Sequence, residues 1–150
     1  MDLILWRHAE ASESEGGLPD ADRELTERGR RQAEGMAEWL RKQPLRKVSV
    51  LSSPTRRARQ TAEMLGLPVK VKNQLGVGAR PSDLLHAAEW PDHAGAIILV
   101  SHQPDLGRLA ALLLAGEEAD WTVKKGGVWW FSNRVRRDET QTVLRAVLNP

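Results

Sequence analysis

Runs rich in apolar and β-branched residues recur along the chain and predict six strands. They cover residues 3–6, 47–53, 69–71, 96–102, 127–132 and 140–148. The first run (LILW) and the fourth (AIILVSH) are dominated by apolar residues, which indicates strands buried in the core. The last two runs lie close together in the chain, so we expect them to form a hairpin or an edge pair.

Between these strands, apolar residues recur at helical spacing. The core-facing stripes of three helices are formed by Ala33, Met36, Ala37 and Leu40, by Ala58, Ala62 and Leu65, and by Leu106, Leu109, Ala110 and Leu113. Thr26 is the expected N-cap of the first helix, whereas Ser53 as N-cap and Pro54 as the first helical residue are expected to begin the second. Gly116 is expected to end the third, and a further helix is expected to open at Ser82.

The alternation of strands with helical stretches predicts an α/β fold, a three-layer α/β/α sandwich around a largely parallel central sheet. Residues 11–23 (ASESEGGLPDADR) are polar and contain glycine, so we expect a loop near the edge of the sheet. We find neither an internal repeat nor a dividing linker, and 150 residues suffice for one self-sufficient core. The sequence therefore predicts a single domain over residues 1–150.

The amino-acid composition indicates which partners and which cellular compartment to expect, but it says little about the activity. The chain has 22 Lys and Arg against 20 Asp and Glu, a formal charge of +2 that does not demand a polyanionic partner. The absence of cysteine excludes disulfides, thiolate catalysis and cysteine-ligated zinc, and it fits a reducing compartment. No segment approaches the roughly 20 apolar residues of a membrane span, and no leader-like segment opens the chain. We therefore expect a cytoplasmic protein without a membrane partner.

Charged and nucleophilic side chains follow three of the predicted strands. Arg7 and His8 come directly after the first strand, Arg57 falls in the first turns of the helix after the second, and His102 closes the fourth. Because the carboxyl ends of parallel strands meet at one edge of a sheet, these residues are expected to share one pocket. Open α/β sheets bind their ligands at that edge.

These residue types suit phosphoryl transfer. Two guanidinium groups, from Arg7 and Arg57, offer planar paired donors that match phosphoryl oxygens and remain charged. A neutral imidazole, from His8, can attack phosphorus without a base and form a phosphohistidine that water later opens. A second histidine, His102, can stabilise the phosphoryl charge when it is cationic.

Other chemistries for the same residues are weaker. A metal site could be built from the side chains of His8, Glu10 and His102, but two arginines in the same pocket would repel a cation. We therefore expect neither a metal nor another cofactor. Ser101, His102 and Asp105 contain the residue types of a hydrolase triad, yet no Gly-x-Ser-x-Gly elbow accompanies them.

Basic and aromatic residues elsewhere favour structural roles over nucleic-acid binding. The arginines of RRARQ (56–60) point to different faces of a helix, and Trp129 and Trp130 lie in a strand where they are expected to pack. We therefore expect no nucleic-acid partner. His86 and His93 are interpreted as structural histidines, because no arginine or second histidine accompanies them in the pattern.

Taken together, the motifs resemble the histidine phosphatase superfamily, whose signature is an Arg-His pair and a small residue after the first strand. The family usually has Arg-His-Gly, and here the third residue is Ala9. The resemblance continues in the family's order through LTERGRRQA (25–33), SSPTRRARQTAE (52–63) and VSHQP (100–104). It therefore spans most of the chain and implies a phosphoglycerate mutase-like fold.

The resemblance also implies roles for individual residues. His8 corresponds to the nucleophile that accepts the phosphoryl group, and His102 corresponds to the second histidine. Arg7 and Arg57 correspond to the phosphate-binding arginines, and Arg23 is similar to a further basic contact of the family's pocket.

The short chain is most similar to the SixA-type phosphohistidine phosphatases. Many superfamily members carry a glutamate after the third strand as proton donor to an alkoxide, but residues 73–83 (NQLGVGARPSD) contain none. A protonated imidazole leaves without such an acid, so its absence favours a phosphohistidine substrate on a protein. Asp83 or Glu89 remains a candidate acid. A small-molecule phosphomonoesterase and a non-catalytic phospho-binding module therefore stay open as alternatives.

Overall fold

A six-stranded mixed sheet forms the centre of the molecule, with its strands in the order β3-β2-β4-β1-β5-β6. The computed structural model describes residues 1–150. The strands are β1 (Asp2–Arg7), β2 (Ser49–Ser52), β3 (Val69–Val71), β4 (Ala96–Ser101), β5 (Val128–Arg136) and β6 (Glu139–Leu148). The first four run parallel, whereas β5 pairs antiparallel with both β1 and β6. The predicted parallel sheet and closing hairpin are both confirmed.

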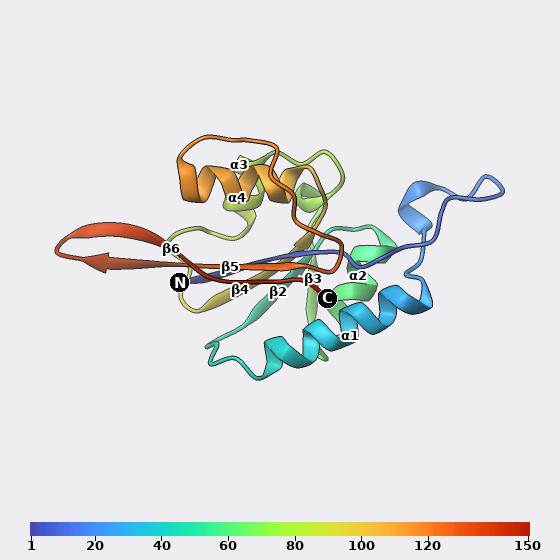
Figure 1. Ribbon diagram of the computed structural model, residues 1–150, viewed down its shortest axis with the longest axis horizontal. Coiled ribbons are helices and arrows are strands. Elements are labelled where there is room, and N and C mark those ends of the chain that lie inside the picture. The colour runs from blue at the N-terminus through green and yellow to red at the C-terminus, as the bar shows by residue number, and fades with distance from the viewer.

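Four α-helices cover the sheet, with α1 and α2 on one face and α3 and α4 on the other (Figure 1). They are α1 (Glu27–Arg41), α2 (Arg56–Glu63), α3 (Pro81–Ala87) and α4 (Asp105–Ala115). Two single-turn 3-10 helices, η1 (Asp20–Asp22) and η2 (Asn73–Leu75), lie in the connections. This arrangement is the predicted three-layer sandwich. None of the helices is both long and apolar enough to cross a membrane.

Strand β1 is apolar on both sides because it separates the two halves of the core. Ile4 and Trp6 pack in the cluster that contains the apolar stripe of α1, whereas Leu3 and Leu5 pack in the cluster that contains α4. Successive side chains of a strand point to opposite faces, so a strand covered on both faces needs apolar residues at every position. At the end of this apolar run the side chains become polar, with Arg7 and His8, although His8 and Ala9 are still buried.

The helix boundaries confirm two of the predicted caps and correct a third. The Thr26 hydroxyl accepts a hydrogen bond from the Gly29 N–H at 2.9 Å, and Gly116 ends α4 with φ of 78°. The expected start of the second helix at Ser53 and Pro54 is wrong, because α2 begins only at Arg56. Ser53 instead continues the sheet, and its N–H donates to the Val100 carbonyl at 3.0 Å. The helix expected to open at Ser82 begins one residue earlier, at Pro81.

Two glycines allow helices to press against the backbone near the carboxyl edge of the sheet. A Cβ at Gly29 of α1 would lie 2.0 Å from the Glu10 carbonyl oxygen, and a Cβ at Gly107 of α4 would lie 1.7 Å from that of Trp121. Any side chain at either position would force these segments apart. The segments after β1 and before β5 are thereby held close to the helices.

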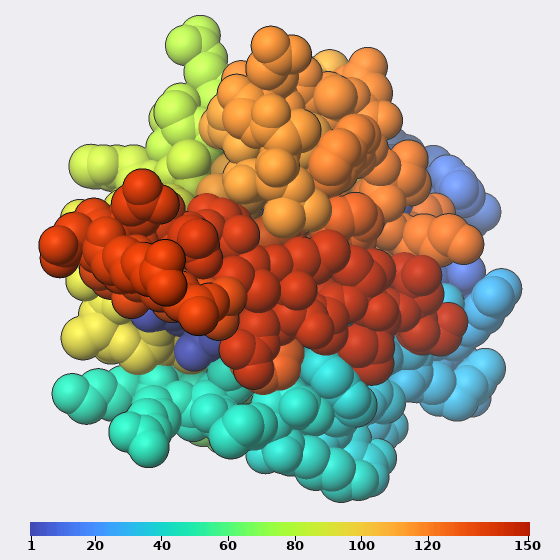
Figure 2. Space-filling view, turned by 60° about the vertical axis from the view of Figure 1, so that its left-hand side comes forward, coloured from blue at the N-terminus to red at the C-terminus, as the bar shows by residue number.

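The edge of the sheet formed by β6 lies between the two helical layers, with α4 above it and α1 below it in Figure 2. The tip of the β5–β6 hairpin projects from the end of the molecule at which the N-terminus lies (Figure 1). Residues 11–23 lie at the opposite end, beside the carboxyl end of β1. The two ends of the molecule are therefore structurally distinct, and only the second carries the predicted reactive residues.

Candidate active site

The carboxyl ends of β1, β2 and β4 bring the sequence-predicted residues to one cavity of about 200 Å³. All five predicted site residues line it: Arg7, His8, Arg23, Arg57 and His102. Other lining residues are Ala11, Glu13, Val77, Gln103 and Lys125. The topological argument from parallel strand ends is thus confirmed for the position of these side chains.

The end of β1 is fixed by a segment more than a hundred residues further along the chain. The Gly126 N–H approaches the carbonyl oxygens of Arg7 and His8 at 3.1 and 3.0 Å, and the Arg7 N–H donates to the Gly127 carbonyl at 3.1 Å. Gly126 has φ of 72°, a conformation that favours glycine. On the other side, the His8 N–H donates to the Ser101 carbonyl at 3.2 Å. These bonds hold the backbone of the Arg-His pair from two directions.

The His8 ring is held in one tautomer by its own neighbourhood. Nδ1 lies 2.8 Å from the Ala9 carbonyl oxygen, and because a carbonyl only accepts, Nδ1 must carry the proton. Nε2 of the neutral ring is then left with a free lone pair. Burial is the main cause that lowers the pKa of His8 to about 3, and the nearby His102, Arg57 and Arg7 act in the same direction. The His8 ring is therefore neutral and oriented at ordinary pH, with Nε2 as its free nitrogen.

His102 faces His8 across the cavity. The two ring centroids are 5.2 Å apart, with an angle of 57° between the rings. His102 Nε2 lies 2.7 Å from the Ser53 hydroxyl oxygen and 3.4 Å from that of Thr55. Burial, followed by the positive charge of Arg57, lowers the pKa of His102 to about 4. The hydroxyl of Ser53, expected to cap a helix, is thus used to orient this ring.

Arg7 contributes a guanidinium group whose bonding capacity is only partly used. Its Nη1 donates to the Val123 carbonyl at 3.0 Å, while its Nε is buried without a hydrogen-bond partner. Burial lowers the pKa of Arg7, which reflects the cost of keeping this charge out of water. An anion in the cavity would offset that cost.

Arg57 is buried, and the loop before α1 holds it in place. Its two terminal nitrogens donate to Asp20, Nη1 to the backbone carbonyl at 2.8 Å and Nη2 to the side chain at 3.1 Å. The other carboxylate oxygen of Asp20 accepts from Arg23 Nε at 3.0 Å. One carboxylate therefore bridges two guanidinium groups that would otherwise repel each other. The Nε of Arg57 is buried and unpartnered, as it is in Arg7.

The positive charges also act on Asp20 itself. Although desolvation acts in the opposite direction, the charges and hydrogen bonds of Arg57 and Arg23 lower the pKa of Asp20. For Arg57, burial is the main cause of a lowered pKa, and the charge of Asp20 partly opposes it. The carboxylate stays ionised wherever the two arginines are charged, so the bridge persists at ordinary pH.

The two carboxylates considered as general acids, Asp83 and Glu89, lie outside the cavity. Asp83 Oδ2 accepts a hydrogen bond from the Arg80 N–H at 3.0 Å and caps α3. Glu89 Oε2 lies 3.7 Å from His93 Nδ1. The carboxylate that does line the cavity is Glu13, in the polar loop after β1. The chain contains no group of three His, Cys, Asp or Glu side chains placed to hold a metal ion.

Several residues of the site were not identified from the sequence. Asp20, Ser53, Glu13 and Lys125 all contact or line it. Ser53 was expected only as a helix cap, and the other three lie outside the predicted strands and helices. Asp20 and Glu13 lie in the loop over residues 11–23, whose fold depends on tertiary contacts. One signal in the sequence was available for Asp20. Buried guanidinium groups require a negatively charged partner, so a carboxylate was to be expected near Arg57.

The fold and the pocket of two histidines and paired arginines define a phosphoglycerate mutase-like α/β protein of the histidine phosphatase class. The model of the histidine phosphatase superfamily (branch 1) matches residues 3–76, a segment that includes Arg7, His8 and Arg57. An uncharacterized protein from Picosynechococcus is 31% identical over 150 residues, covering 95% of this chain and 91% of that protein. The chain belongs to the histidine phosphatase superfamily, and SixA-type proteins are among its structural neighbours.

Solved structures extend the likeness over the whole chain. A candidate phosphohistidine phosphatase SixA from Nakamurella multipartitia has a TM-score of 0.76 at 25% identity, covering 99% of this chain and 95% of that chain. A candidate alpha-ribazole-5'-P phosphatase from Escherichia coli has a TM-score of 0.68 at 25% identity, covering 100% and 97%. The protein is therefore a phosphatase, and the two neighbours differ in the substrate that their names give.

Proposed function

We propose that the protein is a phosphohistidine phosphatase that removes the phosphoryl group from a histidine of another protein through a covalent intermediate on His8. The observation that carries the proposal is the neutral His8 ring with Nδ1 bound to the Ala9 carbonyl at 2.8 Å. It leaves Nε2 free as a nucleophile in a cavity that two arginines line. A non-catalytic phospho-binding module would not need this arrangement.

In the first step, the lone pair of His8 Nε2 forms a bond to phosphorus while the P–N bond of the substrate breaks. When the other nitrogen of the substrate ring is protonated, that ring leaves as neutral imidazole without a separate acid. The charge that develops on the phosphoryl oxygens is met by Arg7 and Arg57, whose Nε groups are buried and unpartnered. His102 faces the reacting group from the other side of the cavity.

In the second step, water attacks phosphorus and the bond to His8 Nε2 breaks. Phosphorylated His8 with a proton on Nδ1 is cationic, and the Ala9 carbonyl stabilises it as an acceptor. The ring leaves with the bonding electrons and returns to its neutral form, so it needs no proton from elsewhere. The water protons remain with the released phosphate. Both steps thus use groups that are present in the cavity.

The set of carboxylates near the cavity favours a P–N substrate. A serine or sugar alkoxide needs a proton as it leaves, whereas a protonated imidazole does not. Neither Asp83 nor Glu89 lines the cavity, and Glu13 is an exposed residue of the loop after β1. No buried acid is therefore positioned beside the leaving group.

A small-molecule phosphomonoesterase is the second candidate function. The observation that favours it is Glu13, which lines the cavity and could donate the proton that an alkoxide requires. The likeness to the Escherichia coli candidate alpha-ribazole-5'-P phosphatase, at the same 25% identity, supports the same reading.

A comparison of three substrates tests the two functions. We expect kcat/KM on a phosphohistidine protein to exceed that on a phosphoserine peptide and on a sugar phosphate by about 100-fold or more, the scale of a lost general acid. Release of inorganic phosphate measures all three rates under one condition. Equal or faster hydrolysis of the esters would reject the phosphohistidine assignment. In that event, loss of ester hydrolysis in Glu13→Gln would identify the acid.

The lowered pKa values of the two histidines make a separate prediction. Both rings stay neutral as the pH falls from 7 to 5, because their pKa values of about 3 and about 4 lie below the usual 6.5. A phosphate dianion in the cavity favours the charged form of the adjacent ring, so saturating phosphate is expected to raise the pKa of His102. Nuclear magnetic resonance titration of labelled histidines measures the pKa values of both rings, without and with phosphate. Protonation of His8 near pH 6.5 in the free protein would contradict the proposed neutral ring.

A further inference from the structure

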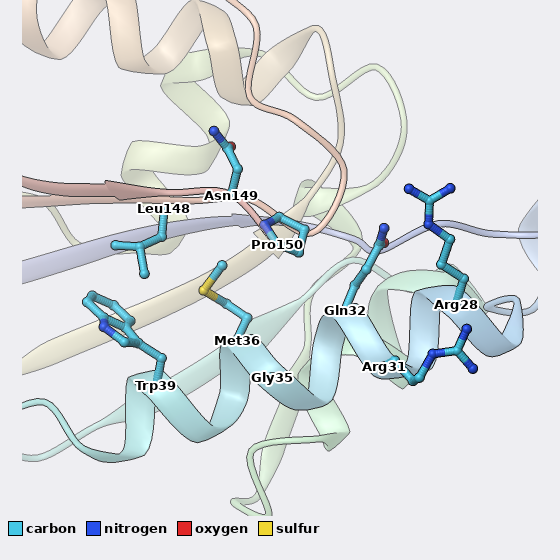
Figure 3. A pocket seen from close by; sticks show the side chains of 9 residues that line it. All are labelled: Arg28, Arg31, Gln32, Gly35, Met36, Trp39, Leu148, Asn149 and Pro150. Carbon is cyan, nitrogen blue, oxygen red and sulfur yellow. The ribbon is translucent and has the colours of Figure 1, made fainter.

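A second hollow of about 590 Å³ lies along α1, between this helix and the residues that end the chain. Figure 3 shows Arg28, Gln32, Met36 and Trp39 along one side of α1, with Leu148 facing them from the end of β6. The part near the start of α1 is basic and the part near Trp39 is apolar. This hollow is larger than the active-site cavity of about 200 Å³, and the proposed chemistry does not use it.

A third hollow, of about 360 Å³, connects the one along α1 to the active site. It shares Arg28 and Gln32 with the hollow along α1, and it shares Arg7 and Lys125 with the active-site cavity. The three depressions are therefore neighbours on the surface, with the third hollow between the other two. We call the part outside the active site the α1 groove, and it is defined by Arg28, Gln32, Met36, Trp39, Lys124 and Leu148.

The connecting part of the α1 groove carries positive charge that the protein neutralises only in part. Lys124 and Lys125 are exposed and form no ion pair, and Arg28 has only a 3.7 Å contact with Glu10. Arg7 adds a fourth cation on the side of the active site. Glu10 is the one acidic side chain that lines this hollow, so four cations there face one carboxylate.

We propose that the α1 groove is the docking surface for an acidic segment of the phosphorylated substrate protein. The inference rests on the proposed phosphohistidine phosphatase activity. The active-site cavity of about 200 Å³ accommodates a phosphoryl group and its imidazole, and the adjoining hollows add space that a small phosphate ester would leave unfilled. Carboxylates near the phosphohistidine match Arg28 and Lys124, and an apolar side chain further along fits against Met36 and Trp39.

The proposal is tested with the double variant Arg28→Glu/Lys124→Glu. The probes are a histidine phosphotransfer protein phosphorylated with phosphoramidate and, as a small substrate with the same P–N bond, free phosphohistidine. We expect kcat/KM on the protein to fall by about tenfold or more, the range of two lost electrostatic contacts, and kcat/KM on free phosphohistidine to stay within about twofold. Added salt is expected to slow the wild-type enzyme on the protein substrate only.

The double variant Lys70→Glu/Arg134→Glu is the matched control. Both residues are exposed, neither forms an ion pair, and neither lines the α1 groove or the active-site cavity. It changes the net charge by the same amount and is expected to leave both rates unchanged.

Three outcomes would overturn the docking surface. They are an equal loss in both double variants, no loss in the groove variant, and an equal loss on free phosphohistidine. A wild-type enzyme that hydrolyses free phosphohistidine but not the phosphorylated protein would reject the proposed protein substrate and the docking surface together. Wild-type hydrolysis of the protein with an unaffected groove variant would reject the docking surface alone.

Discussion

Replacement of His8 by alanine is expected to abolish turnover, with a loss in kcat on the order of 10⁴-fold or more, as for removal of other covalent nucleophiles. The cavity would keep its arginines and His102, so phosphate binding should survive the change. The measurement is phosphate release from a phosphohistidine protein, with inorganic phosphate binding as the check on the pocket. His86→Ala is the matched control, because His86 is an exposed histidine outside the cavity.

The same variant also tests the covalent intermediate. Rapid acid-free quenching of the wild-type enzyme with labelled substrate is expected to trap about one phosphoryl group per active site. The label should map to His8, be labile in acid and be stable in base, as expected of a phosphoramidate. His102→Ala should slow its formation without moving it. Label on Ser53, Ser101 or His102, or full turnover by His8→Ala, would overturn the proposed mechanism.

Replacement of Arg57 by alanine is expected to lower kcat/KM by about 10- to 150-fold, which corresponds to the roughly 1.5–3 kcal/mol of a hydrogen bond to a charged group. The guanidinium group of Arg57 is buried at the cavity wall. When it is removed, no solvent takes its place as a partner for the phosphoryl oxygens. The loss of Arg57 also releases Asp20, whose carboxylate then lies near the anion with only Arg23 as partner. Both effects weaken phosphate binding in the ground state and in the transition state.

Arg56→Ala is the control for this prediction. Arg56 is the neighbouring residue of α2, is exposed, and forms a surface ion pair with Glu24 instead of lining the cavity. It is expected to change kcat/KM by less than about twofold, because surface ion pairs contribute little. Circular dichroism and thermal melting confirm that both variants fold. Equal activity of a folded Arg57→Ala variant and the wild type would show that Arg57 does not contact the substrate.

The position of the site was predictable because it follows from one topological rule. The apolar runs and helical periods predict a parallel sheet, and a parallel sheet places Arg7, His8, Arg57 and His102 at one edge. The predicted caps Thr26 and Gly116 succeed for a similar reason, since each depends on contacts within its own helix end.

The details that escaped prediction all depend on contacts between distant segments. Ser53 has the sequence pattern of a helix cap, but its hydroxyl is bonded to a ring 49 residues away. Asp20 looks like one of several loop carboxylates until the fold places it 3.1 Å from Arg57. Local propensity cannot distinguish these residues from their neighbours, because the energy that selects their conformation comes from partners brought together by folding.

The place of β1 in the sheet has a consequence for how the protein is made. β1 is synthesised first, yet both of its neighbours, β4 and β5, emerge from the ribosome after residue 95. The backbone of Arg7 and His8 is fixed only after Gly126 has been translated and its N–H has bonded to their carbonyl groups. An apolar β1 must therefore stay unpaired until the residues after 95 are translated, a period in which nascent chains are exposed to aggregation. A product truncated before Gly126 lacks the hydrogen bonds that fix the backbone of Arg7 and His8, so its pocket stays unassembled.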